Sequence, residues 1–479
     1  MLNKDNFDLN ILLVIVNVLL CITALGLYIT TGPNQYITLY TVILMCLLGS
    51  QNVLMLLYGR IKREPFVLIL VANTTVFYAA RVVSLLYNPS SITFSRSVVL
   101  PDHINYILVF IMLSNVSIFL GLNVTKQQIV YNRNIPEDQH PARALYVIFI
   151  LFAAIIIPYF ELLPVSVFGR FSGYILAVFF QLFLIMLLSL LYLIINFRKI
   201  SIRSRFAILI LLGLFVLFKT VTGGRSSLLN LAVLLLVVIL SFKGRIILNK
   251  KIILLCILLI PLSIFFYNLA TACRPFFKAV PDVFSEQKRL AVKDHEFFSV
   301  FCQFDITKFC QPVFDRIGFL DFSVDIIKHQ EQYSSVINTE YYLKSIVDNC
   351  LTPGFDVFGT PRAENALRYI YQDLPSPTHQ DINNAYHADM LTIYGEYHIL
   401  FGKYQALLVF FICSYVFKKI YLALKNKDIF LLFLYRAIVL LIFYRWLNSF
   451  GTDWFVFDLV GIFITVFLFK NFYKMRTES

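Results

Sequence analysis

Charged residues are scarce in this sequence: they make up 14% of 479 positions, while 59% are hydrophobic and 48 are phenylalanine. The mean hydropathy is +0.76. A soluble chain of this length buries such a composition only in two or three large cores. The shortage of charge therefore favours a membrane protein over a soluble one.

No small-residue cleavage site follows the first apolar run, which begins at Asn10, so we interpret this run as a retained span and not a signal peptide. A bilayer is crossed by apolar helices of about 17 to 25 residues. The sequence has twelve such runs, which predict an all-α polytopic protein with spans at 9–30, 36–58, 65–87, 105–124, 145–162, 172–197, 207–223, 226–242, 252–272, 396–417, 429–449 and 454–470.

The basic residues are unevenly distributed, because more than half of the 41 lie in the termini and at every second gap between spans. The short segments of opposite parity carry only Arg96, Arg170 and Arg225. By the positive-inside rule, both termini are cytoplasmic. This topology also explains the net charge of +13, and segment 273–398 has no basic stripe interleaved with aromatic residues, so nucleic-acid binding is excluded.

Residues 273–395 form the one segment between spans that is long enough for a domain, and we call it the outer segment. Apolar residues three to four positions apart predict short helices in it at 284–300, 312–330, 339–350 and 362–371. We therefore divide the chain into 1–272 with nine spans, the outer segment, and 396–479 with three spans and a cytoplasmic tail.

The eight cysteines show no CxxC or Cys/His spacing, so they do not indicate a zinc site. Cys273, Cys302, Cys310 and Cys350 lie in the outer segment, where an oxidising compartment permits two disulfides in any of three connectivities. Free thiols remain the alternative.

Charged residues inside predicted spans cost about 2.5 to 3.5 kcal/mol at the membrane centre, so each is expected to face a partner or a wet cavity. Arg445 and Asp458 lie at similar depth on adjacent spans, and a structural ion pair is at least as good an interpretation as a substrate role. Arg81 and Lys219 lie near the outer ends of their spans without an evident acidic partner. They favour an anionic ligand that enters from outside.

Two short motifs place an arginine at a predicted helix N-terminus. Segment 222–227 contains Gly223 and Gly224, which permit a tight turn between spans, followed by Arg225 on the cation-poor side. In segment 359–364, Thr360 is the expected N-cap and Arg362 lies in the first turn. A helix N-terminus with a guanidinium suits a phosphate or pyrophosphate, although the turn alone explains the glycines.

A third motif, at 386–402, lies where the outer segment re-enters the membrane. On one continuous helix, His387 and Tyr394 share a face, while Asp389 and Glu396 lie nearly opposite. If the helix begins after Asp389, that carboxylate can approach His387. His387 is the preferred proton acceptor for a sugar hydroxyl, with Asp389 and Glu396 as rivals.

These motifs together resemble the pattern of bacterial O-antigen polymerases and the related O-antigen ligases. The likeness covers residues 207 to 417 and is carried by Gly223-Gly224-Arg225, Pro361-Arg362 and the segment from His387 to Gly402. The sequence departs from that pattern at Ala388, where Asn is common, and at His398, where Gly is common.

The resemblance implies a GT-C-like, metal-independent glycosyltransferase of the bacterial inner membrane with its large loop in the periplasm. It would need no cofactor and would transfer a growing glycan from undecaprenyl pyrophosphate to a sugar hydroxyl of a lipid-linked repeat unit. A chain-length-regulating membrane protein is a further candidate partner. The pyrophosphate would be held by Arg225 and Arg362, with Arg81, Lys219 and Arg274 as further candidates.

Three rival functions remain open. One is a structural or scaffold membrane protein, which would not need Arg81, Lys219 and Arg225 clustered toward one side. A ligase performs the same chemistry with lipid A core as acceptor, and the sequence does not separate it from a polymerase. A lipid-linked oligosaccharide flippase would have two related halves and small outer loops, whereas this sequence shows one large loop and no internal repeat.

Overall fold

The computed structural model describes residues 6–62, 64–89, 101–125, 319–351, 357–360, 392–424, 429–448 and 451–475, with isolated positions between 188 and 249 and Ala363. Their long elements are helices, and the strands are one short ribbon. The elements are β1 Asn6–Asp8, α1 Leu9–Thr31, α2 Leu39–Lys62, α3 Pro65–Thr74, η1 Thr75–Ala79, α4 Ala80–Tyr87, α5 Pro101–Asn123, β2 Ile247–Asn249, α14 Phe319–Lys328, α15 Gln330–Val336, α16 Thr339–Ile346, η6 Val347–Leu351, α19 Ile393–Ala423, α20 Ile429–Leu447 and α21 Thr452–Met475.

Five described helices are long and apolar enough to cross a membrane: α1, α2, the continuous stretch from α3 through η1 to α4, α5 and α19. They correspond to predicted spans one to four and ten, so the prediction of an all-helical membrane protein is confirmed for this part of the chain. Helices α20 and α21 lie where spans eleven and twelve are predicted. Spans five to nine fall outside the described ranges, and the count of twelve stays a prediction.

Local chemistry explains where the first and third spans begin. The Asp8 side chain accepts a hydrogen bond from Asn10 N at 3.0 Å and thereby caps α1. Glu64 precedes Pro65, the first residue of α3, where the missing N–H of proline costs nothing. Both starts agree with the predicted boundaries.

The second span differs from its prediction of 36–58, because α2 runs from Leu39 to Lys62. The Asn34 side chain accepts from the backbone N–H groups of Tyr36 and Ile37, each at 2.9 Å, which holds these apolar residues in a loop. At the other end, Arg60 and Lys62 continue the helix, where cations are favoured by the C-terminal dipole.

A buried polar network joins the first three spans at the π-helical turn η1. Asn17 of α1 donates to the Thr75 hydroxyl at 3.0 Å, and Asn52 of α2 donates to Asn17 Oδ1 at 3.1 Å. All three side chains are buried. A π turn is rare and is often found at functional sites. Its position beside this polar network makes the region a candidate for a functional role in addition to its structural one.

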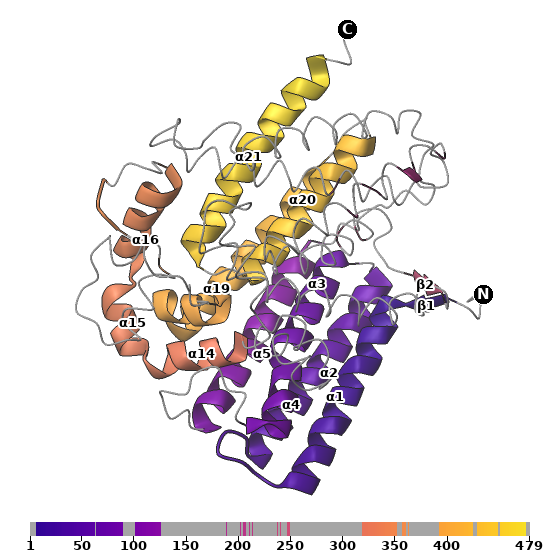
Figure 1. The fold of residues 1–479 in the computed structure, drawn as a ribbon, viewed down its shortest axis with the longest axis vertical. Coiled ribbons are helices and arrows are strands. Elements are labelled where there is room, and N and C mark those ends of the chain that lie inside the picture. The colour runs from indigo at the N-terminus through magenta and orange to yellow at the C-terminus, as the bar shows by residue number, and fades with distance from the viewer. Residues whose placement is uncertain are drawn as a thin grey trace, which may run out of the picture.

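The two ends of the helix bundle carry different chemistry. At the end that we call inner, Arg60 forms an ion pair with Asp8 at 3.3 Å, and Lys418 pairs with Glu64. At the same end, β1 pairs antiparallel with β2. The two strands come from the N-terminus and from the loop after the predicted eighth span, which are both predicted to lie on the cytoplasmic side. Helices α14–α16 contact α5, α19 and α21 at the end that we call outer, away from the N-terminus (Figure 1).

The described part of the outer segment agrees in part with the predicted helices. Helix α14 lies within the predicted 312–330, and α16 with η6 occupies the predicted 339–350. Helix α15 was not predicted, Ala363 is helical as expected, and 284–300 lies outside the described residues. Cys350 is buried with its Sγ 3.1 Å from Asp453 O, and the other three outer cysteines are not described, so their pairing stays a prediction.

Candidate functional site

The motif at 386–402 ends in a short helix that is separated from the rest of α19 by a kink. Helix α19 starts after Thr392 and is interrupted at Gly402, where φ is 70° and ψ is 176°. The motif residues from Ile393 to His398 are all buried. Because Thr392 is not helical, the alternative in which one continuous helix carries both His387 and Tyr394 is wrong, and Asp389 precedes the helix as well.

Gly402 adopts a backbone conformation that is essentially restricted to glycine. We expect Gly402→Ala to lower the free energy of unfolding by about 1–3 kcal/mol, because any Cβ is strained there. A Cβ at Gly402 would meet nothing within 4 Å, so the effect isolates the backbone. The measurement is the thermal unfolding of the purified protein.

Gly26, in the middle of α1, provides the matched control, since a Cβ there also meets nothing within 4 Å and its φ is not in the left-handed region. Gly26→Ala is expected to stabilise by roughly 0.5–1 kcal/mol. Equal unfolding temperatures for the two variants would contradict a strained kink.

Thr392 starts the helix in an unusual conformation, since φ is 48° at this β-branched residue. Its buried hydroxyl lies 2.7 Å from Ser323 Oγ of α14 and accepts from Gly395 N at 3.3 Å. A Cβ at Gly395 would lie 3.0 Å from Ile326 Cδ1. The start of the motif helix is thus fixed by direct contact with the outer segment.

Glu396 is 1% exposed and lies at the outer end of the bundle. Its Oε1 accepts a hydrogen bond from Thr452 N, the first residue of α21, at 2.6 Å. Its Oε2 has no hydrogen-bond partner among the described residues. Burial and the nearby carboxylates of Glu396 and Asp453 raise the pKa of Tyr342 well above its usual value, so this phenol stays protonated beside the carboxylate.

Asp453 joins the outer segment to the start of α21. Its Oδ2 accepts from Ser345 Oγ and from Ala363 N, each at 2.8 Å. Asp348 accepts from Thr360 N at 2.7 Å. Thr360 and Ala363, the described neighbours of Arg362, are therefore both held by carboxylates.

Tyr394 lies on another side of the same short helix and is fully buried. Its hydroxyl donates to Asn115 Oδ1 of α5 at 2.8 Å, and Asn115 Nδ2 donates to the Thr74 hydroxyl at 3.3 Å. Thr74 adjoins the π turn η1. The motif is thereby linked to the buried polar region of the first spans.

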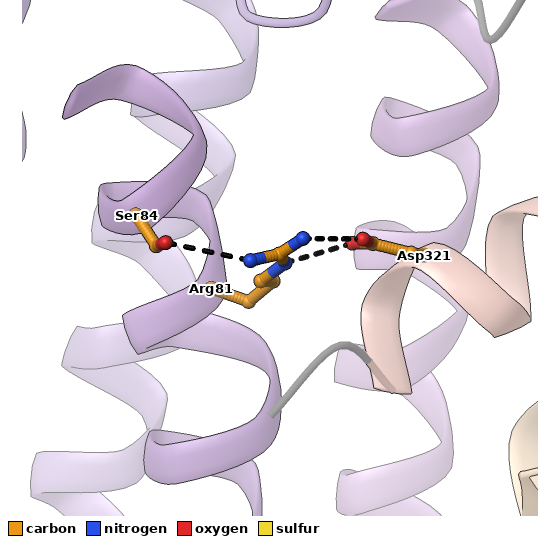
Figure 2. A network of polar contacts seen from close by, with 3 residues as sticks. All are labelled: Arg81, Ser84 and Asp321. Atoms are coloured by element: carbon orange, nitrogen blue, oxygen red, sulfur yellow. Dashed lines mark hydrogen bonds and ion pairs between the residues drawn. The ribbon is translucent and has the colours of Figure 1, made fainter. Parts of the chain in front are cut away.

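Arg81 is fully buried on α4 and forms a two-pronged ion pair with Asp321 of α14 (Figure 2). Nε lies 3.0 Å from Oδ1, Nη2 lies 2.6 Å from Oδ2, and Nη1 donates to Ser84 Oγ at 3.4 Å. The expectation that Arg81 has no acidic partner is therefore wrong. The role of Arg81 as a phosphate ligand stays a prediction, and Asp321 competes for the same guanidinium.

Of the predicted site residues, the structure describes Arg81, Tyr394 and Glu396, and each has a different partner. Arg81 contacts Asp321 of the outer segment, Tyr394 donates to Asn115 of α5, and Glu396 accepts from Thr452 of α21. His387, Asp389, Lys219, Arg225, Arg274 and Arg362 lie outside the described residues, as does the side chain of Asp458. No group of three or more His, Cys, Asp or Glu side chains suited to a metal ion is found in the described part of the chain.

Sequence reasoning missed Asp321, Tyr342 and Asp453. The sequence contains a signal for Asp321. Asp321 and Asp325 are four residues apart in a short helix, and each directly follows an apolar residue, Leu320 or Val324. Both acids are buried. Carboxylates beside the apolar stripe of an amphipathic helix indicate partners on the surface that the helix covers.

No family model matches this sequence, and no curated protein or solved structure matches it.

Proposed function

We propose that this chain is a metal-independent membrane glycosyltransferase that polymerises lipid-linked oligosaccharide repeat units. The observation that carries the proposal is the short helix before the kink, in which residues 393 to 399 are buried. Tyr394 and Glu396 make polar contacts there with α5 and α21, and Thr392 at its start contacts Ser323 of the outer segment. Burying the polar side chains of this helix and their partners at one end of an apolar bundle costs free energy. Proteins typically accept this cost at functional sites.

In this proposal the outer segment lies in the periplasm of a bacterium and both termini are cytoplasmic. The donor is a growing glycan on undecaprenyl pyrophosphate, and the acceptor is the non-reducing-end sugar hydroxyl of one lipid-linked repeat unit. Arg225 and Arg362, with Lys219 and Arg274, bind the departing pyrophosphate. Cations at that position stabilise the transition state more than the ground state, because negative charge grows on the leaving group.

The acceptor hydroxyl needs a base, and the described geometry supports assigning different roles to the three candidates. Glu396 Oε1 is engaged by the N-terminus of α21, which suits a residue that positions the motif helix. His387 and Asp389 precede that helix and are not confined to opposite faces of it. We retain His387 as the base, because its unperturbed pKa near 6.5 leaves it able to accept a proton at neutral pH, with Asp389 as rival.

The direct test incubates the purified protein with lipid-linked repeat units alone and separates the products by length. A polymerase makes a ladder of lipid-linked chains. A ligase makes no ladder without lipid A core, and a flippase makes no new glycosidic bond, so either result would contradict the proposal.

In the same assay, His387→Ala is expected to reduce the rate about a hundredfold or more with acceptor binding largely kept, because only proton transfer is removed. The rate and acceptor KM are measured at fixed donor. If His387→Ala retains normal rates while Asp389→Asn is inactive, the base is the carboxylate.

A further inference from the structure

Three polar side chains that the proposed reaction does not use converge beside the kink of α19. The hydroxyl of Tyr106, on α5, lies 2.7 Å from His398 Nε2, just before the kink. The Lys403 ammonium, just after the kink, lies 5.5 Å from the centre of the Tyr106 ring. Tyr106 thus contacts both the imidazole and the cation.

Lys403 has aromatic neighbours in place of an acidic one. Its Nζ lies 5.7 Å from the centre of the Tyr404 ring, in addition to the contact with Tyr106. None of the ion pairs found within the described ranges includes Lys403. A half-buried ammonium on a membrane helix, held by rings and not by a carboxylate, favours an external anion as its counterion.

The kink adds the polarity of a helix N-terminus at the same position. Because Gly402 interrupts α19, a new helix of about six turns starts at Lys403 and continues to Ala423. The first N–H groups of a helix lack acceptors within it, and its dipole places partial positive charge there. The backbone therefore reinforces the charge of Lys403.

His398 supplies an independent indication of a ligand. It is 4% exposed, and its Nδ1 has no hydrogen-bond partner within the described part of the chain. Buried polar atoms nearly always have a partner. When the Tyr106 hydroxyl donates to Nε2, the imidazole proton is on Nδ1, which can then donate to an anion.

An apolar stripe leads along α19 from this cluster toward the inner end. Tyr404 is 79% exposed, and Leu408, Ile412 and Val416 follow it at four-residue spacing and are exposed as well. Residues at this spacing lie on one face of a helix. An anion that also carries a hydrocarbon chain matches both parts of this surface.

We infer that the Lys403 ammonium and His398 Nδ1 bind the phosphate group of a membrane lipid, whose hydrocarbon chain lies along the Tyr404–Val416 face of α19. The Tyr106 hydroxyl, by donating to Nε2, holds His398 in the tautomer that donates from Nδ1. The site uses none of the residues assigned to the pyrophosphate of the proposed reaction. Its occupancy is independent of turnover, so this inference and the proposed function can fail separately.

The test measures lipid retention by native mass spectrometry of the full-length protein in detergent. Dioleoyl phosphatidic acid is the probe, and dioleoylglycerol is the control with the same chains and no phosphate. We expect wild type to retain the phosphatidic acid selectively, and Lys403→Gln to weaken its binding about tenfold, as for loss of one charge-assisted contact. Tyr106→Phe and His398→Gln are expected to weaken it severalfold, and Lys403→Arg to preserve it.

Lys419 is the matched control, because it lies on the same helix with its Nζ 5.5 Å from the Tyr415 ring, away from the kink. Lys419→Gln is expected to leave retention unchanged. Equal losses for Lys403→Gln and Lys419→Gln would overturn the site, since any surface cation would then suffice. Displacement of the probe by millimolar inorganic phosphate would show a phosphate site without lipid selectivity and overturn the lipid assignment.

Discussion

Replacing Asp321 with alanine is expected to lower the free energy of unfolding by about 3–5 kcal/mol, because the Arg81 guanidinium would lose both of its carboxylate contacts while remaining buried. Arg81→Ala should lower the free energy of unfolding by a similar amount, because the Asp321 carboxylate would then be buried without the guanidinium. Substituting both residues together, Arg81→Met with Asp321→Leu, should recover most of the loss, since apolar side chains of similar volume often replace a buried pair at little cost. Chemical unfolding of the purified variants in detergent gives the three values and their coupling.

An exposed pair in the same outer segment calibrates this experiment. Glu340 is 73% exposed and contacts Lys344 four residues later at 2.7 Å. Glu340→Ala is expected to leave the free energy of unfolding almost unchanged, because exposed ion pairs are screened by solvent. If Asp321→Ala proved as mild as Glu340→Ala, the Arg81–Asp321 pair would not be what attaches α14 to the spans.

Arg225→Ala and Arg362→Ala are each expected to abolish chain elongation while the protein is inserted at its normal level. Either substitution removes a guanidinium proposed to bind the leaving pyrophosphate. Arg225→Lys should also lose most activity, because an ammonium does not reproduce two parallel N–H contacts to phosphate oxygens. Ladder formation in the purified assay is the measurement.

Lys62 serves as the comparison for these arginines, since it is exposed at the inner end of α2, remote from the outer segment. Lys62→Ala is expected to give normal ladders. Normal ladders from both arginine variants would instead remove these residues from the proposed mechanism.

The sequence predicted the described spans well where apolar length and local capping agree. The span predicted at 65–87 is observed from Pro65 to Tyr87, because proline sets its start and the apolar run sets its length. The span predicted at 36–58 is shifted, since hydropathy does not register the Asn34 side chain that holds Tyr36 and Ile37 outside the helix. The length of a membrane-spanning helix is thus easier to predict from sequence than the residue at which the helix begins, because a single side-chain hydrogen bond can shift that start.

The candidate site was predictable only in part. Residue types indicated Tyr394 and Glu396, but their partners Asn115 and Thr452 come from other helices. Arg81 and Asp321 are 240 positions apart, and no local pattern joins residues at that separation. The positive φ of Gly402 was equally hidden, because a glycine within an apolar helix is compatible with a straight helix.

The π turn at Thr75–Ala79 determines which way the end of its helix faces. One residue more in a helix rotates everything beyond it by about 100°, the angle between successive residues. Arg81 follows the turn closely, while Asn17 and Asn52 hold the turn itself through Thr75. The turn thus fixes the rotation of Arg81 about the helix axis relative to the buried network of Asn17, Asn52 and Thr75. Inserting or deleting one residue here is therefore expected to turn Arg81 away from Asp321.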